Sequence, residues 1–541
     1  MENNGEKKNS PATVIMHPFL FVIFPPLFLF SENYYQVEFL EVLPPLLFLI
    51  LFALLAFFIP GSIIADSYIR ALVLSGFLFI FFTFGHFHNW VNISLAEGVD
   101  LKFKIMLWLS LALVLLGFFF LLRYFFAKEG GLAGLTEFLN VSSLALVSIS
   151  LISIGFKIIN YNKQRVDPVK KIFARAKKIN RDLPDIYLFL LDGYARDDIL
   201  KKYYQYDNSN FSQFLKKKGF RILKNSHSNY GFTLPALSSL FNFSLHQFGP
   251  EHKGLTLKDN KIFTRLIWNN RLLPLLKSLG YTSVSFDSGG GRDIHLRSVD
   301  VFFATPGWNL SDFQVLLIRT TIIPYLVDAL HKCSKKFFIW DLYNINRKRF
   351  FYTLKKVEEI SKNPGLKFVF AHFLQPHEPF LFNADGSAKN PPPGVDGTVW
   401  FIPFKGRNKE DYIKGYTGQL SFLNNKIKSL VDRIFSNSKK EPIIIIFSDH
   451  GPALQMEPYD MAKSNLNERF SNLMAFYFPH KKLLKLLKPN MTPVNTFPFL
   501  FKHIFKMNTP ALPDRSFFAP ADDFYHFQDI TDRVNAKKNP E

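Results

Sequence analysis

The sequence predicts an α/β protein in which an N-terminal bundle of five transmembrane helices precedes a three-layer α/β/α domain. Two observations support this fold class. Within the first 160 residues, five long stretches lack Lys, Arg, Asp and Glu, and from residue 182 onward short apolar runs alternate with longer mixed segments. The composition, 48% hydrophobic with 63 Phe, excludes a disordered chain, because so much apolar surface has to be buried.

The five apolar stretches are long enough, or nearly so, to cross a hydrocarbon core of about 30 Å as helices. They comprise residues 11–31, 42–65, 71–96, 105–122 and 138–156. The first stretch is interrupted by Pro25 and Pro26, whereas the second has Pro44 and Pro45 near its start, where a helix tolerates them better. A cleaved signal peptide accounts for one such stretch but not for five.

The basic residues in the short loops favour a cytoplasmic N-terminus. In this orientation the cytoplasmic side carries Lys7, Lys8, Arg70, Arg123 and Lys128, against Lys102 and Lys104 on the opposite side. Five crossings then place the α/β domain outside the cytoplasm. We therefore expect a multi-pass inner (cytoplasmic) membrane protein whose α/β domain lies on the periplasmic or extracellular side.

The formal net charge of +21 indicates an anionic partner, either a nucleic acid, an anionic membrane or a phosphorylated substrate. An exported domain without a zinc-finger, helix-turn-helix or RNA-binding pattern argues against nucleic acid. A single cysteine, Cys333, excludes an intrachain disulfide and a cysteine-based zinc knuckle.

The α/β domain is predicted from continuous apolar runs that suit the buried strands of a largely parallel sheet. The runs are residues 186–191, 282–286, 366–370, 442–447 and 473–478. We divide the chain into a transmembrane domain (1–160), a basic juxtamembrane linker (161–181), an α/β domain (182–524) and a polar tail (525–541). A basic, aromatic-rich helical insert at about 311–362 either lies in the membrane interface or covers the sheet.

Acidic or imidazole groups accompany four of these runs. Asp192, Asp287 and His372 follow the first three, and Asp449 with His450 follow the fourth. Because ligands bind at the carboxyl ends of strands in open α/β sheets, we expect a metal site there. Two carboxylates and an imidazole, from Asp192, Asp449 and His450, suit one divalent ion such as zinc or manganese.

Thr233 is the candidate nucleophile. Pro235 favours the first turn of a helix, which places the Thr233 hydroxyl at the cap, beside free backbone N–H groups and the positive end of the helix dipole. A bound metal lowers the pKa of such a hydroxyl. The simpler alternative is that Thr233 only caps the helix.

Four motifs in order resemble the alkaline phosphatase/sulfatase superfamily: Leu-Leu-Asp192-Gly, Thr233-Leu-Pro235, Pro376-His377-Glu-Pro379 and Ser448-Asp449-His450-Gly451. The five-helix N-terminus resembles the membrane-anchored branch, the lipoteichoic acid synthases and lipid A phosphoethanolamine transferases. The resemblance implies that Asp192, Thr233, Asp449 and His450 bind the metal and that Thr233 forms a phospho-threonine intermediate. It gives His377 a substrate or leaving-group role, and Arg292 the place of a phosphate-binding arginine.

The sequence departs from the superfamily in three ways. The transferases usually have Glu where this chain has Asp192. Sulfatases carry Cys or Ser in a Cys/Ser-x-Pro-x-Arg motif, whereas Thr233 and Leu237 stand at the first and last positions here, so formylglycine chemistry is not expected. Two-metal phosphatases need a further set of Asp and His ligands, which the motifs above do not supply, and this favours one metal.

These features predict a membrane-anchored, metal-dependent transferase or hydrolase that acts on phosphodiester-linked groups of the phosphoglycerol or phosphoethanolamine type. The expected partners are a membrane lipid donor and an envelope glycan or lipid acceptor. One alternative is a non-catalytic envelope protein that uses the same fold for binding or assembly. A transporter is the other, although nearly charge-free helices without a repeat between halves argue against it.

Overall fold

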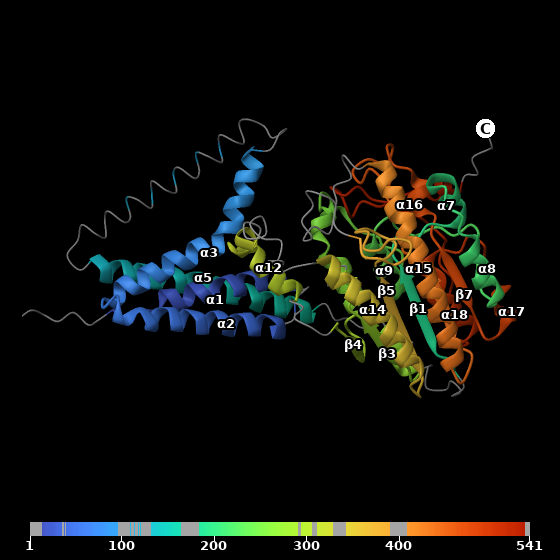
Figure 1. The fold of residues 1–541 in the computed structure, drawn as a ribbon, viewed down its shortest axis with the longest axis horizontal. Coiled ribbons are helices and arrows are strands. Elements are labelled where there is room, and N and C mark those ends of the chain that lie inside the picture. Colours follow the sequence, from blue (N-terminus) through green and yellow to red (C-terminus); the bar gives the residue numbers. More distant parts are fainter. Residues whose placement is uncertain are drawn as a thin grey trace, which may run out of the picture. The chain divides into compact units, whose positions relative to one another are not determined.

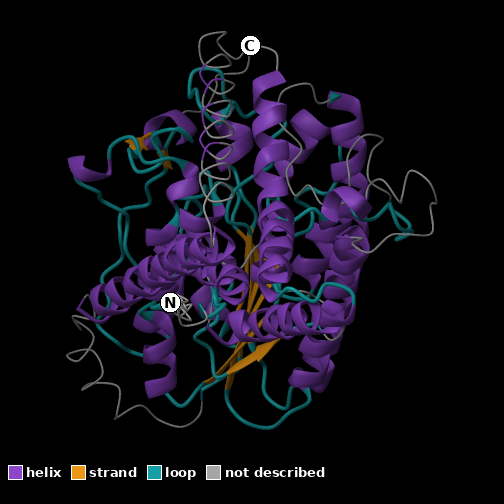
Figure 2. Cartoon of the chain, turned by 90° about the vertical axis from the view of Figure 1, so that its left-hand side faces the viewer, coloured by secondary structure: helices purple, strands orange, loops and turns teal. Residues whose placement is uncertain are grey.

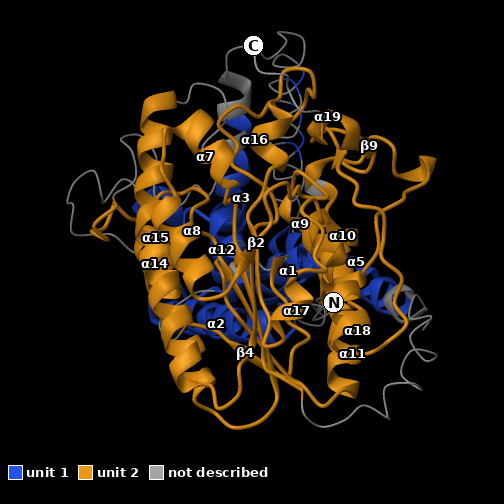
Figure 3. Ribbon diagram, turned by 90° about the vertical axis from the view of Figure 1, so that its right-hand side faces the viewer, with its two compact units in different colours: residues 1–166, 310–339 blue, residues 167–309, 340–541 orange. Residues whose placement is uncertain are grey.

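The computed structural model describes residues 13–34, 37, 39–95, 131–163, 183–289, 294–305, 311–327, 342–389 and 408–535, with isolated positions between 106 and 120. The chain forms two compact units, which are coloured separately in Figure 3. One unit contains residues 1–166 and 310–339, and the other contains residues 167–309 and 340–541.

The N-terminal unit is helical. Its long helices are α1 (His17–Glu32), α2 (Phe39–Phe58), α3 (Ser67–Leu95) and α5 (Gly131–Lys163). Three spans, Phe39–Ser62, Ser67–Phe87 and Gly131–Ile159, are long and apolar enough to cross a membrane, whereas α1 is a shorter apolar helix of 16 residues. The predicted fourth stretch, 105–122, lies outside the described residues apart from isolated positions. The helical anchor is therefore present, and the count of five crossings stays a prediction.

Polar side chains inside this unit connect its helices. Asn140 on α5 accepts hydrogen bonds from the backbone N–H groups of Met16 and His17, at 2.9 and 2.8 Å. It thereby provides an acceptor for N–H groups at the start of α1, which have no partner within the helix. The His17 Nδ1 atom lies 2.6 Å from the Ser75 hydroxyl on α3. Large apolar side chains such as Leu51 and Ile80 face outward. Polar contacts inside and apolar side chains outside are the arrangement expected of helices in lipid.

A segment from the middle of the chain packs against these helices. Helix α12 (Asp312–Thr320) buries Phe313 and Leu317 in the same apolar cluster as α1, α2 and α3, and the Ile322 N–H donates to the Phe81 carbonyl at 3.1 Å. The second half of the predicted insert, α14 (Leu342–Ser361), belongs to the other unit and packs on α15 (Lys409–Asn437) and β5 (Lys367–Phe373) (Figure 1). The second half of the insert thus covers the sheet, and a place for the insert in the membrane interface stays a prediction.

We expect Gly85→Leu to release this segment, because a Cβ at Gly85 would lie 2.3 Å from the Arg319 carbonyl oxygen. Overpacking of this kind costs about 1–3 kcal/mol, so tryptic cleavage after Arg319 in detergent-solubilised protein should accelerate by roughly tenfold or more. Gly76→Leu on the same helix is the control, because nothing lies within 4 Å of its Cβ position. Equal cleavage rates in both variants would contradict the contact.

The second unit is built on a seven-stranded sheet in the order β2-β7-β6-β1-β5-β3-β4. Its strands are β1 (Ile186–Leu191), β2 (Arg221–Ile222), β3 (Thr282–Phe286), β4 (Val301–Phe303), β5 (Lys367–Phe373), β6 (Ile443–Phe447) and β7 (Met474–Tyr477). The strands β6, β1, β5, β3 and β4 are parallel to one another. At the edge beside β6, β7 pairs antiparallel with β6, and β2 pairs antiparallel with β7. All five predicted runs form strands, and the largely parallel sheet is confirmed.

Helices cover both faces of this sheet. The described helices of this unit are α7 (Asp197–Tyr204), α8 (Ser209–Lys217), α9 (Thr233–Asn242), α10 (Lys261–Trp268), α11 (Leu272–Ser278), α14, α15, α16 (Leu466–Phe470), α17 (Lys481–Leu484), α18 (Thr496–His503) and α19 (Thr531–Asn535). Alternate residues of β1 enter opposite clusters, with Phe189 toward α8, α14 and α15 and Leu188 toward α9, α10, α11 and α18. Figure 3 shows these two helix layers on either side of the strands.

The folded part of this unit extends beyond residue 524, the position at which we expected it to end. Strand β9 (Gln528–Asp529) pairs with β8 (Phe517–Phe518) in a small sheet, which Figure 2 shows apart from the main one. The side chains of Tyr525, Ile530 and Val534 are buried, which explains why residues 525–535 are ordered into the fold rather than forming part of a polar tail.

Candidate metal centre

Two neighbouring strands bring the predicted metal ligands together. Asp192 directly follows β1, and Asp449 and His450 follow β6, which pairs with β1 in parallel. One ligand atom from each of these three buried residues lies within 4.8 Å of the others. The group therefore forms at the carboxyl edge of the sheet, because adjacent parallel strands end at the same edge.

Hydrogen bonds hold the two turns in register. The Ser448 hydroxyl accepts from the Tyr194 N–H at 2.8 Å and donates to the His450 carbonyl at 2.6 Å. Gly193 has a positive φ of 69°, which glycine adopts without a steric penalty. The hydroxyl of Tyr416, a residue of α15, donates a hydrogen bond of 2.9 Å to the Gly193 carbonyl. The ligands thus sit on turns that are fixed from both sides.

The donor atoms fit a divalent cation. Asp192 Oδ2 lies 3.0 Å from His372 Nε2, and Asp449 Oδ1 accepts from the Gly193 N–H at 3.4 Å. The other carboxylate oxygens, Asp192 Oδ1 and Asp449 Oδ2, are buried and have no hydrogen-bond partner among the described residues. Both face His450 Nε2, at 3.7 and 3.2 Å.

The orientation of His450 supports the same assignment. Its Nδ1 atom lies 3.0 Å from the Gly451 carbonyl, so a neutral ring donates there and keeps a lone pair on Nε2. Metal-ligating histidines usually donate their second nitrogen to a carbonyl or carboxylate in this way. Two unpartnered carboxylate oxygens and an imidazole lone pair that converge in a buried site are a suitable ligand set for zinc or manganese.

Electrostatics keep these groups in the forms that bind a metal. Burial and the adjacent Asp192 carboxylate raise the pKa of Asp449 to about 6. Burial also opposes the charged form of Asp192, but the electrostatic influence of the neighbouring imidazoles of His377, His450 and His372, with a hydrogen bond from His372, brings its pKa well below the usual range. Burial and the positive charge of Arg469 lower the pKa of His450 well below its ordinary value. The imidazole is therefore neutral at physiological pH.

Thr233 is adjacent to this group. It is the first residue of α9, and the N-cap is Phe232, so the expectation that Thr233 itself occupies the cap is wrong by one position. No side chain makes a capping hydrogen bond at this helix end, and Thr233 Oγ1 instead lies 3.2 Å from His450 Nε2. The side chain is half-buried. This arrangement does not support capping as the function of the hydroxyl.

Arg469, which the motif analysis did not identify, joins the two halves of the site. Its Nε donates to the Gly231 carbonyl at 2.7 Å and its Nη1 to the Gly451 carbonyl at 2.9 Å. The buried guanidinium thus connects the loop before Thr233 with the turn after His450. It lies on the short helix α16, outside any strand end, and no sequence spacing distinguishes it from a surface arginine.

The two histidines after β5 have different surroundings. His372 lies inside β5 rather than after it, because the strand extends to Phe373 along β1, and its ring bonds to Asp192. His372 is therefore a buried strand histidine that is hydrogen-bonded to a predicted metal ligand. His377 is half-buried, its N–H donates to the Asp192 carbonyl at 3.1 Å, and its ring centroid lies 6.1 Å from that of His450.

Asp287, another candidate at a strand end, does not join this group of metal ligands. Asp287 Oδ2 lies 2.9 Å from Arg349 Nε, and Asp287 Oδ1 lies 3.4 Å from His295 Nε2, so this carboxylate is neutralised away from the centre. Arg292 lies outside the described residues.

Fold and site together define a membrane-anchored α/β protein with a candidate metal centre at the carboxyl edge of its sheet. The family comparison makes this class specific. A model of the sulfatase family matches residues 195–504, which is more than half of the chain. The chain therefore belongs to the sulfatase family, and the superfamily resemblance of its motifs is confirmed.

Several solved structures are similar at low sequence identity. The periplasmic domain of EcEptC from Escherichia coli, in complex with Zn, is 12% identical with a TM-score of 0.39, over 60% of this chain and 83% of that one. The integral membrane protein lipooligosaccharide phosphoethanolamine transferase A from Neisseria meningitidis is 12% identical with a TM-score of 0.36, over 90% and 95%. No curated protein sequence matches the chain.

Proposed function

We propose that this chain is a membrane-anchored, metal-dependent enzyme that transfers or hydrolyses a phosphodiester-linked group through a phospho-threonine at Thr233. The observation that carries the proposal is the position of Thr233 Oγ1, 3.2 Å from His450 Nε2 and beside two unpartnered carboxylate oxygens. Within the sulfatase family, the threonine and the leucine at position 237 disfavour formylglycine chemistry. A phosphoglycerol or phosphoethanolamine group fits the resemblance of the sequence motifs.

Four residues would hold the metal: Asp192, Thr233, Asp449 and His450. When bound, a divalent ion supplies the positive charge that lowers the pKa of a hydroxyl and stabilises anionic oxygens. The first-turn N–H groups of α9 add a positive field at the phosphoryl position. Arg469 keeps the two loops at a fixed separation, so Thr233 is preorganised for attack.

The proposed reaction has two steps. Thr233 Oγ1, having lost its proton to solvent, forms a bond to phosphorus while the bond to the leaving alcohol breaks, and His377 gives that alcohol a proton. A glycan hydroxyl or water then attacks phosphorus and passes its proton to His377, and the bond to Thr233 breaks. Arg292 is proposed to bind the phosphoryl oxygens.

The location of the enzyme follows from its helices. The apolar spans hold it in a membrane, where a phospholipid donor is at hand, and the loop charges favour a catalytic domain outside the cytoplasm of a bacterial cell. The proposed acceptor is an envelope glycan or lipid.

Mass spectrometry of the Thr233 region tests the proposal. The purified full chain is incubated with Zn²⁺ or Mn²⁺ and with phosphatidylethanolamine or phosphatidylglycerol, then digested. We expect an added mass on Thr233 that identifies the transferred group. No adduct with any combination, together with no metal bound to Asp192, Asp449 and His450, would favour the binding or assembly protein instead.

Metal affinity should depend on pH through Asp449. Because its pKa is raised to about 6, the carboxyl holds a proton below that pH and a metal must displace it. The apparent dissociation constant for Zn²⁺ should rise by about tenfold per pH unit below 6 and vary little between 6.5 and 8. Competition with a chromophoric chelator measures it. A constant affinity down to pH 5 would exclude Asp449 as a ligand.

A further inference from the structure

A group of exposed lysines lies at the edge of the main sheet where β2 is the last strand. Two of them end α8, one follows β2, and two lie in or just after α17. They have no ion-pair partner among the described residues, and we call them the lysine surface: Lys216, Lys217, Lys224, Lys482 and Lys485. Figure 3 shows this edge, with α8 and α17 on either side of β2.

Hydrogen bonds hold the two parts of the lysine surface together. The Arg221 Nη1 atom donates to the Leu484 carbonyl at 2.6 Å, across 263 positions of the sequence. The Asn225 N–H donates to the Pro489 carbonyl at 3.0 Å. The chain around β2 and the chain around α17 therefore lie side by side, so lysines that are distant in the sequence form one surface.

The segment that carries α17 combines lysines with leucines. Residues 481–488 read Lys-Lys-Leu-Leu-Lys-Leu-Leu-Lys. Leu487 is buried and packs, with half-buried Leu483 and Leu484, in the apolar cluster on the α9 face of the sheet. Leu486, in contrast, is 53% exposed. The buried leucines fix the segment, which leaves lysines and one leucine on the outside, a combination typical of segments that bind a membrane interface.

The lysines at the border of this surface have other contacts. Lys218 forms an ion pair with Asp432, and Lys488 Nζ lies 3.9 Å from Asp514 Oδ2. Lys481 Nζ lies 3.3 Å from the centre of a tyrosine ring. No such ion pair compensates the five charges of the lysine surface within the described residues. Because like charges held close together repel one another, an anionic partner that binds across them is favoured.

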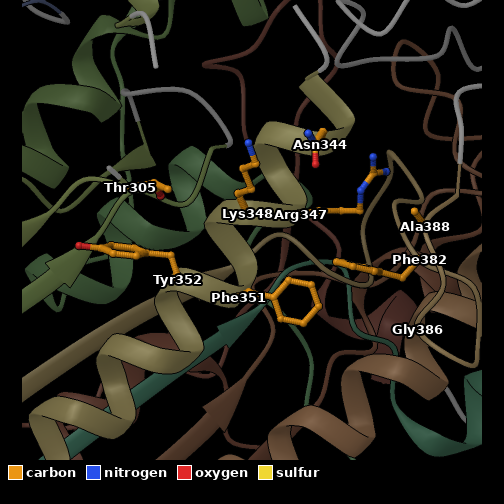
Figure 4. Close-up of a pocket in the computed structure, with 9 residues that line it drawn as sticks. All are labelled: Thr305, Asn344, Arg347, Lys348, Phe351, Tyr352, Phe382, Gly386 and Ala388. Carbon is orange, nitrogen blue, oxygen red and sulfur yellow. The ribbon is translucent and has the colours of Figure 1, made fainter. Parts of the chain in front are cut away.

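A second group of basic side chains in this unit differs in its surroundings. Arg347 and Lys348 contribute to the lining of a cavity of about 500 Å³, and Figure 4 shows both side chains extending from α14. No residue of the lysine surface lines that cavity. The lysine surface instead spreads over α8, α17 and the chain after β2, so it suits an extended array of negative charges better than one small ligand.

A membrane surface offers such an array. The apolar spans of the chain keep a bilayer within reach of the unit that is covalently joined to them. Anionic phospholipids present a plane of phosphate groups, and the apolar layer beneath it can take up an exposed leucine. A soluble polyanion has phosphates but no apolar layer.

We propose that the lysine surface docks on anionic phospholipid headgroups, with Leu486 entering the boundary between headgroups and acyl chains. The lipid contact stands on this surface alone and does not require the proposed function.

Fluorescence quenching tests the docking with the full chain in lipid nanodiscs. The native cysteine is removed by Cys333→Ser, and Leu486→Cys carries an environment-sensitive fluorophore. A quencher on the acyl chains should reduce its emission by about threefold or more in discs with phosphatidylglycerol, and little in discs of phosphatidylcholine alone. High salt should reverse the difference, because it screens the charges. The same fluorophore at Tyr459→Cys, a position 62% exposed and outside the lysine surface, should respond to neither lipid.

Two double variants of the labelled chain test the charges. Each lysine beside an anionic membrane strengthens binding by a factor of about five, so Lys482→Gln with Lys485→Gln should lower the ratio of docked to undocked protein by roughly 25-fold. Lys348→Gln with Lys355→Gln removes the same charge from exposed positions on α14 and should have no effect. The fold should survive in both variants, because all four side chains are exposed.

Lysine acetylation by a water-soluble reagent gives a second readout, in which Leu486 is unchanged. Mass spectrometry compares Lys482 and Lys485 in phosphatidylcholine discs, in phosphatidylglycerol discs, and in phosphatidylcholine discs with added polyphosphate. We expect about fivefold protection in phosphatidylglycerol discs, whereas Lys355 should be modified equally throughout.

Three outcomes would overturn the proposal. Equal quenching and equal acetylation in both kinds of disc would exclude docking on anionic lipid. An equal effect of the two double variants would show that net charge matters and that this surface does not. Protection by polyphosphate without protection by phosphatidylglycerol would assign the surface to a soluble polyanion instead.

Discussion

Turnover should fall by at least about 10³-fold when Thr233 is replaced by alanine, because the change removes the atom that forms the covalent bond. The fold should remain intact. The hydroxyl makes no capping hydrogen bond and the side chain is half-buried, so the stability cost is expected to be below about 1 kcal/mol. Release of the alcohol from a labelled phospholipid by the full chain measures the rate.

Two comparisons make this result specific. Thr233→Ser keeps a hydroxyl at the same position and should retain the adduct and part of the activity. Thr496→Ala changes another threonine that begins a helix, α18, and should leave turnover unchanged. If Thr233→Ala remained within about tenfold of the parent, covalent catalysis by Thr233 would be excluded, because loss of a nucleophile costs far more.

Replacing Asp449 with asparagine should abolish both metal binding and activity. The substitution removes one of two negative charges and the buried oxygen Oδ2, which leaves Asp192 and His450 as an incomplete ligand set. Metal analysis should show close to one ion per parent chain and almost none per variant chain. Activity of the variant should fall by about 10³-fold. The parent protein should lose activity to the same extent when EDTA removes its metal.

Although Asp449→Asn should lose metal binding and activity, we expect this variant to be more stable than the parent when no metal is present. Because the pKa of Asp449 is raised to about 6, its ionised form destabilises the metal-free fold above that pH, and asparagine removes this cost. In EDTA at pH 8 the variant should be more stable than the parent by about 1–3 kcal/mol. A variant that is less stable in EDTA would show that Asp449 has a structural role instead.

Asp287→Asn is the matched control for this experiment. Asp287 also ends a strand at this edge of the sheet, but its carboxylate pairs with Arg349. Its replacement should leave the metal content unchanged and lower stability, because a buried guanidinium loses its partner. Equal loss of metal in both variants would mean that the centre extends to β3.

The local sequence determined the strands and the residues that end two of them. Continuous apolar runs such as 442–447 form strands because both of their faces must be buried between helix layers. Asp192 and the Asp449-His450 pair could therefore be assigned to the sheet edge, where polar groups remain after the apolar run stops. Thr233 could be placed in the first turn of a helix from Pro235, although its position differed from the cap by one residue.

The sequence does not determine which strands become neighbours, because pairing between β1 and β6 joins residues about 250 positions apart through crossover connections. That pairing selects Asp449 and His450 as companions of Asp192 and leaves Asp287, two strands from β1, to Arg349. The linking role of Arg469 also exists only after two loops meet. Helix α12 packs against α1, α2 and α3 for the same reason: its apolar side chains specify burial, and tertiary contacts alone determine which surface buries them.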